Sequence, residues 1–101
     1  MKVTNDIIKA NGTILLGYIT SPYEVLCEKL GDPNRRPSED GKVTCEWIID
    51  FEDGSIGTIY TWKTGENLAI QYEWSVGGRG TNILEKISKL IGRPARRTLM
   101  A

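Results

Sequence analysis

Residues 43 to 76 read VTCEWIIDFEDGSIGTIYTWKTGENLAIQYEWSV, and this stretch contains three segments in which apolar and polar residues alternate. Strict alternation is the pattern of a strand with one buried face, so we expect three consecutive strands here. The three tryptophans of the chain are distributed one to each segment. The stretch therefore predicts an antiparallel sheet with one apolar, aromatic-rich face and one polar face.

The expected pairing of these strands follows from the first turn. Asp53-Gly54 is a dipeptide favoured in two-residue hairpins, and folding about it pairs Trp47 with Tyr60. The third strand, residues 68 to 76, keeps its apolar side chains on the same face if its connection has an odd number of residues. An aromatic face of this kind is a stacking platform for bases in some proteins, but here we expect it to be the core. The aromatic residues predicted on it are Trp47, Tyr60, Trp62, Tyr72 and Trp74.

Two amphipathic helices are expected beside the sheet. Ser21 is a predicted N-cap followed by Pro22 and by Glu24 of a capping box, and Gly31 ends this helix. Its predicted buried face carries Tyr23, Leu26, Cys27 and Leu30. The second helix is capped by Thr81 or Asn82 and ends at Gly92. Its apolar stripe consists of Ile83, Leu84, Ile87, Leu90 and Ile91.

Earlier in the chain, residues 13 to 19 have the length and composition of a strand, and residues 6 to 9 form at most a short helical turn. The expected order is β-α-β-β-β-α, which predicts a two-layer α+β fold with both helices on one face of a mainly antiparallel sheet. We expect one domain over residues 1–92 and a basic, flexible C-terminal tail over residues 93–101.

Composition excludes several classes of function. Hydrophobic residues make up 40% and charged residues 26%, which is typical of a globular domain. No apolar run is long enough to cross a membrane and no signal-peptide pattern is present, so a cytoplasmic location is expected. The chain has no histidine, which excludes Cys/His zinc sites and His-dependent triads. We expect Cys27 and Cys45 to be buried free thiols, and we expect no metal, no cofactor and no enzymatic activity.

Charge is unevenly distributed along this neutral chain. Residues 39 to 73 contain eight acidic residues and two lysines, whereas residues 79 to 101 contain six basic residues and one acidic residue. An acidic sheet face and a basic C-terminal segment are therefore candidate surfaces for a partner, although a solvated sheet face is the commoner explanation for the acids. The candidate partner-binding residues are Glu46, Asp50, Glu73, Arg93, Arg96 and Arg97.

A glycine-rich segment follows the third predicted strand. Backbone N–H groups in such a loop, together with a helix N-terminus and an arginine, suit a small anion or a nucleotide. The alternative is that the glycines only permit a tight turn. The candidate anion-binding residues are Gly77, Gly78, Arg79, Gly80 and Thr81.

Several short motifs also occur in a characteristic order: Gly17-Tyr18-Ile19, Tyr23-Glu24, Leu30-Gly31-Asp32-Pro33, Glu46-Trp47, Phe51-Glu52-Asp53-Gly54, Thr58-Ile59-Tyr60, Trp62-Lys63 and Trp74-Ser75-Val76-Gly77-Gly78. Their order and spacing, over roughly residues 13 to 90, resemble a family of small, functionally uncharacterised proteins of tailed bacteriophages. The resemblance implies a virus-encoded accessory protein of the host cytoplasm and brings no catalytic residues.

Three functional hypotheses follow from these observations. The first is a non-enzymatic inhibitor that binds a host protein, such as a CRISPR effector or another defence component. The second is a small-anion or nucleotide binder that sequesters a signal through Gly77 to Gly80. The third is a nucleic-acid accessory protein that uses Arg93, Arg96 and Arg97. A homodimer is compatible with each of them.

Overall fold

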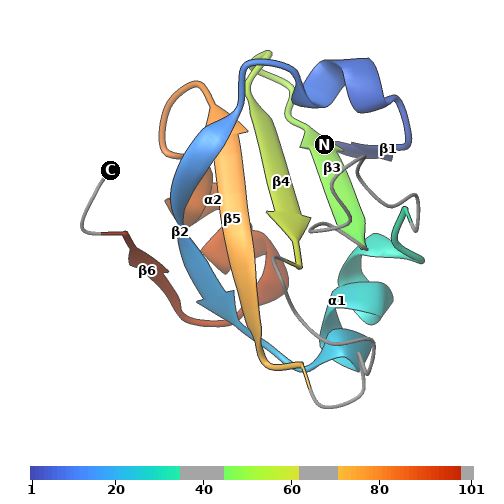
Figure 1. The fold of residues 1–101 in the computed structure, drawn as a ribbon, viewed down its shortest axis with the longest axis vertical. Helices are drawn as coiled ribbons and strands as arrows, with labels where there is room; N and C mark the ends of the chain where they lie inside the picture. The colour runs from blue at the N-terminus through green and yellow to red at the C-terminus, as the bar shows by residue number, and fades with distance from the viewer. Residues whose placement is uncertain (35–44, 62–70, 99–101) are drawn as a thin grey trace.

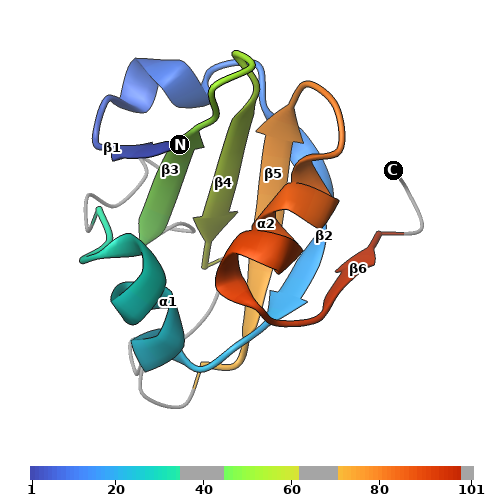
Figure 2. The same cartoon turned by 180° about the vertical axis from the view of Figure 1, so that it is seen from behind.

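The computed structural model describes residues 1–34, 45–61 and 71–98, which form an antiparallel sheet with two α-helices on one face (Figures 1 and 2). The strands follow the order β1-β3-β4-β5-β2-β6 across the sheet. The predicted two-layer α+β class is therefore confirmed. The elements are β1 (Lys2–Thr4), the 3₁₀-helix η1 (Ile7–Ala10), β2 (Ile14–Thr20), α1 (Tyr23–Leu30), β3 (Glu46–Asp50), β4 (Ile56–Tyr60), β5 (Glu73–Arg79), α2 (Ile83–Ile91) and β6 (Ala95–Arg97).

The turn between β3 and β4 is longer than predicted. Residues 52–54 form a three-residue loop, closed by a 3.0 Å hydrogen bond from the N–H of Phe51 to the carbonyl of Ser55. The glycine of this loop has φ of 87°, as three-residue hairpins require. Trp47 consequently pairs with Ile59, and the predicted register is wrong by one residue. A shift of one residue reverses the faces of β4, because side chains alternate along a strand.

The predicted aromatic face is therefore only partly correct. Trp47 and Trp74 are buried, and their ring centroids lie 5.5 Å apart at a steep angle. Tyr60 instead lies on the opposite face of the sheet, and Tyr72 precedes β5 with 55% of its surface exposed. Trp62 lies outside the described residues.

Both helices pack as their apolar stripes predict. In α1, Leu26 and Leu30 are buried, and Tyr23 contacts the rings of both Trp47 and Trp74 at 6.0 Å. In α2 the buried residues are Ile83, Leu84, Ile87 and Ile91. No disulfide joins the two cysteines, and Cys45 is buried while Cys27 is half-buried against the core.

The start of α1 differs from the predicted capping box. The N-cap position is occupied by Pro22, and no side chain caps the helix. Ser21 is fully buried, and its carbonyl accepts a 2.8 Å hydrogen bond from the indole Nε1 of Trp74. Asn82 is the N-cap residue of α2, in a left-handed conformation and without a side-chain cap. Ser21 therefore links β2, α1 and the aromatic core, although the sequence pattern is that of a helix cap.

The two terminal segments add an edge strand on each side of the sheet. β1 pairs with β3, and β6 pairs with β2. Residues 95–97 are therefore part of the sheet rather than of the predicted flexible tail, and Thr98 adds a 3.0 Å hydrogen bond to the carbonyl of Leu16. Gly17 permits this pairing, because a Cβ there would collide with the carbonyl of Arg96.

The sheet face opposite the helices is also partly covered. η1 packs against β3 and β4, and Ile48 and Ile56 of these strands are buried. Figure 1 looks onto this face, with η1 at its upper end and α2 behind the strands. Figure 2 shows α1 and α2 on the other face. The expectation that one face of the sheet is wholly polar is therefore wrong at the end where η1 lies.

Candidate binding surface

The predicted glycine loop is largely a strand. Gly77, Gly78 and Arg79 belong to β5 and pair with β4, and the first two also pair with β2. Of the five predicted residues, only Gly80 and Thr81 lie between β5 and α2, where Asn82 follows them. The prediction of a loop over the whole segment is therefore wrong, because paired strands use their backbone groups within the sheet.

Arg79 also has partners of its own. Its Nε donates to the carbonyl of Asn11 at 3.2 Å, and its Nη2 donates to the carbonyl of Lys9 at 3.1 Å. These carbonyls end η1 and begin the turn toward β2. The guanidinium therefore fastens η1 to the end of β5, and this role depends on a contact between residues about 70 positions apart.

The predicted basic segment is largely engaged by neighbouring residues. Arg93 donates from Nε to the carbonyl of Thr20 at 3.1 Å. Arg97 pairs with Glu85 of α2 at 3.1 Å, on the helix side of the sheet.

Arg96 connects the two surfaces that we predicted to be separate. It pairs with Glu73 at 3.0 Å on the face opposite the helices, which brings an acidic and a basic candidate together. Asp50 lies on the same face and is bound by Lys9 of η1 at 2.9 Å. This hydrogen bond, with the charge of Asp50, raises the pKa of Lys9. The predicted acidic face is thus a face of mixed charge.

The strand register aligns one residue from each of five strands, and one from the chain after α1, in a line across this face. Each member is directly opposite the next in the pairing of the strands, so the side chains share one face. We call this line the sheet row. Its members, from β6 to the chain after α1, are Arg96, Tyr18, Ser75, Tyr60, Glu46 and Asn34.

The sheet row has an aromatic centre and opposite charges near its two ends. The guanidinium of Arg96 lies 4.7 Å from the ring centroid of Tyr18. Ser75 is buried in the middle, and Tyr18 and Tyr60 on either side of it are half-buried. Burial raises the pKa of Tyr60, and the charge of Glu46 contributes in the same direction. At the usual strand spacing, β6 lies about 19 Å from β3, and this is the distance between the backbones of Arg96 and Glu46 along the sheet row.

Glu46 differs from the other acids of this face. Within the described parts of the chain its carboxylate has no ion pair, whereas Asp50 and Glu73 each have one. Burial raises the pKa of Glu46 above its ordinary value. The sequence therefore identified Glu46 as a candidate, but its half-buried position depends on the fold.

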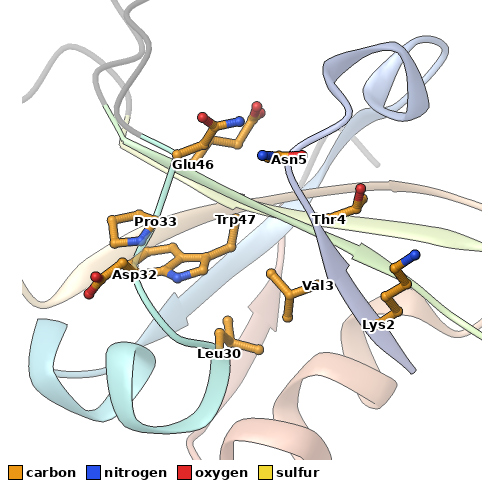
Figure 3. A pocket seen from close by; sticks show the side chains of 10 residues that line it. Lys2, Val3, Thr4, Asn5, Leu30, Asp32, Pro33, Glu46 and Trp47 are labelled. Carbon is orange, nitrogen blue, oxygen red and sulfur yellow. The ribbon is translucent and has the colours of Figure 1, made fainter.

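A pocket adjoins Glu46 at the edge of β3. β1 pairs with β3 as far as Thr4 and Ile48, and Asn34 pairs with Glu46 on the same edge. Between these two partners the edge is open, and the pocket there has a volume of about 570 Å³. In Figure 3, Asp32 and Pro33 lie on one side of Trp47, and Thr4 and Asn5 lie on the other.

Sequence reasoning did not select Tyr18, Ser75, Asn5 or Asn34. Each of them becomes part of the surface through strand pairing or through the meeting of β1 with the chain after α1. The register of β4 follows from the three-residue turn, and Asp53-Gly54 by itself does not distinguish this turn from a two-residue one.

Comparisons with protein-family models, with curated proteins and with solved structures found no match for this chain. No helix in the described parts of the chain is long and apolar enough to cross a membrane. In residues 1–34, 45–61 and 71–98, no three Cys, Asp or Glu side chains group in a way that could hold a metal ion.

Proposed function

We propose that this chain is a non-enzymatic protein that binds a larger protein and blocks part of its surface, with the sheet row at the centre of the contact. The observation that carries the proposal is that two half-buried tyrosines lie between an arginine and a carboxylate on one face. Tyrosine and arginine are enriched at the energetic centres of protein interfaces, because they bury large areas and still form directed hydrogen bonds. The opposite charges near the row's ends would orient the partner.

The resemblance to accessory proteins of tailed bacteriophages supports a host protein as the target. Under this proposal the chain works in the host cytoplasm as an inhibitor of a defence component, for example a CRISPR effector. Inhibition by surface occupation needs shape and charge complementarity and no catalytic group, which agrees with the residue types on the row.

The two other hypotheses gain no support from specific contacts. The guanidinium of Arg79 is directed to two backbone carbonyls rather than to open space. Arg93, Arg96 and Arg97 each have a partner within the protein, so they do not form a free basic stripe for phosphates.

Affinity capture from host lysate with a set of matched variants tests the proposal. We expect wild type to retain a host protein and the double variant Tyr18→Ala/Tyr60→Ala to lose it while keeping its fold by circular dichroism. Lys89→Ala, on an exposed position of α2, is the control and should retain the partner.

Two results would contradict the proposal. In the first, the double variant Tyr18→Ala/Tyr60→Ala captures the host protein as well as wild type does, since the contact would then lie elsewhere. The other is the absence of any captured host protein together with a dimer in gel filtration that the same variant dissociates. The row would in that case join two copies of this chain.

A further inference from the structure

The pocket beside Glu46 offers a site that the proposed function does not by itself require. It lies where two separate segments, the end of β1 and Asn34, pair with the same edge of β3. Polar side chains form one part of its lining, and the other part consists of Trp47, Val3, Leu30 and Pro33 (Figure 3). Its volume of about 570 Å³ is large enough for a side chain or a small organic molecule.

The charges around this pocket are unbalanced. Glu46 and Asp32 are the acidic residues of its described lining, and Lys2 is the one cation among the described lining residues. In the strand register, the backbone of Lys2 lies opposite that of Asp50, four residues along β3 from Glu46. The backbones of Lys2 and Glu46 are therefore about 13 Å apart along the strand direction. No ion pair joins Lys2 to Glu46.

Burial of Glu46 has an energetic cost, since none of the cations in residues 1–34, 45–61 and 71–98 forms an ion pair with it. A half-buried carboxylate loses part of its hydration, and an opposite charge or several hydrogen-bond donors would restore the balance. Burial raises the pKa of Glu46, which is the direction expected for a carboxylate that has lost part of its hydration. An anionic ligand would increase the imbalance, whereas a cation would remove it.

The polar groups around Glu46 favour one kind of cation. Asn5 and Asn34 line the pocket with amide groups, and Thr4 adds a hydroxyl. Each has an oxygen that can accept a hydrogen bond. A guanidinium has five donors in a planar fork, and it binds a carboxylate through two parallel hydrogen bonds. Its remaining donors would suit the amide and hydroxyl oxygens beside Glu46.

We propose that the pocket between β1 and Asn34 binds a guanidinium group, with Glu46 as its carboxylate partner and Asn5 and Asn34 as additional acceptors. Naming an arginine of the protein partner as the source of this group rests on the proposed function. A free guanidine compound has the same chemistry and is the alternative source.

NMR titration of the isolated protein tests the site directly. The probes are N-acetylarginine amide and N-acetylcitrulline amide, which have the same length and differ in charge. We expect saturable shifts with the arginine compound at the amides of Asn5, Asn34 and Glu46. The citrulline compound should bind at least about tenfold more weakly, because charge-assisted hydrogen bonds are lost.

Glu46→Gln should abolish the response, and Glu73→Gln, an exposed acid of the same face, should preserve it. If the Glu46 variant does not fold, wild type supplies the same information at lower pH. Binding should weaken as pH falls through the raised pKa of Glu46. Asp32 and Lys2 in the pocket and Tyr60 on β4 are the other titratable groups to be followed in that experiment.

Three outcomes would overturn the site: no saturable shift with the arginine compound, equal binding of citrulline, or binding that Glu46→Gln leaves unchanged. Equal binding of N-acetyllysine amide would overturn the assignment to a guanidinium. Arginine binding without a captured host protein would support the pocket and contradict the proposed function. Capture of a host protein that depends on Tyr18 and Tyr60, without binding of the arginine compound, would support the proposed function and contradict the pocket.

Discussion

Gly57 and Gly78 are directly opposite each other on β4 and β5, on the face that α2 covers. A Cβ at Gly57 would lie 2.8 Å from Cδ1 of Ile87, and a Cβ at Gly78 would lie 2.7 Å from Cγ2 of Ile83. Both distances are shorter than real Cβ contacts. The glycines therefore set how closely α2 approaches the sheet. The sequence pattern had instead predicted that Gly78 lies in an anion-binding loop.

Gly57→Ala should destabilise the fold by about 1–3 kcal/mol, because the added methyl group overpacks the contact with α2. Ile87→Val removes the Cδ1 atom that would collide, at a cost of about 0.5–1.5 kcal/mol when introduced alone. The double variant should lose less than the sum of the two single variants, as measured by chemical denaturation. Fully additive losses would show that the methyl group is accommodated elsewhere.

Glu46 predicts a pH dependence of stability. Its folded-state pKa lies above the ordinary value of 4.5, so the folded protein holds this proton more tightly than the unfolded chain does. The contribution of Glu46 to stability should therefore fall as pH rises from about 4.5 through the folded-state pKa. Urea unfolding across this range should show the fall in wild type and in Glu73→Gln, but not in Glu46→Gln. Equal curves for wild type and Glu46→Gln would contradict the burial of this carboxylate.

Among the secondary-structure elements, η1 depends most clearly on contacts distant in sequence. Its N-cap is Asp6, whose side chain accepts a 3.2 Å hydrogen bond from the N–H of Ile8. Lys9 binds Asp50 of β3, and Arg79 of β5 binds two carbonyls at the end of the element. Isolated turns of this length are unstable, so these contacts are what hold η1 over Ile48 and Ile56.

Arg79→Ala should release η1 and cost about 1 kcal/mol, a typical net value for exposed hydrogen bonds. Amide exchange should accelerate at Asn11 and Thr13, while the central strands remain protected. Arg79→Lys is the matched control for charge. It should behave nearly like the alanine variant, because an ammonium cannot reproduce the Nε and Nη2 hydrogen bonds together. Full rescue by lysine would show that charge, rather than the fork geometry, holds the element.

At the level of the whole molecule, one aromatic cluster joins the two layers. Tyr23 of α1, Trp47 of β3 and Trp74 of β5 contact one another within 6.0 Å between ring centroids. Trp47 also donates from Nε1 to the carbonyl of Gly31 at 2.9 Å, and this hydrogen bond ties the end of α1 to the sheet. The first helix and the sheet should therefore unfold together.

Trp47→Ala should cost about 3–5 kcal/mol, because it leaves a large cavity in this cluster. Such a loss is comparable with the total stability of many domains of this size. Denaturation followed by circular dichroism and by tryptophan fluorescence should give coincident curves in wild type and a large shared shift in the variant. Trp47→Phe retains a ring and should cost less. Separate transitions for the two probes would contradict the coupling of α1 to the sheet.

Local sequence signals identified the elements whose formation depends on neighbours in the chain. The apolar stripe of α2, its end at Gly92 and the end of α1 at Gly31 are all confirmed, since helical periodicity and a glycine terminus are short-range features. The alternation in β3 likewise predicted that Trp47 and Ile49 face the core.

Pairing between distant segments decided the rest. One additional residue in the β3–β4 turn moved Tyr60 from the core to the opposite face, and no local pattern distinguishes the two registers. β1 and β6 are too short to be recognised alone and exist because the sheet offers them an edge. The sheet row and the half-buried position of Glu46 depend on all of these pairings. The C-terminal ends of the two helices were predictable because they arise from local backbone chemistry. The candidate surface instead arises from contacts that form only when the whole sheet assembles.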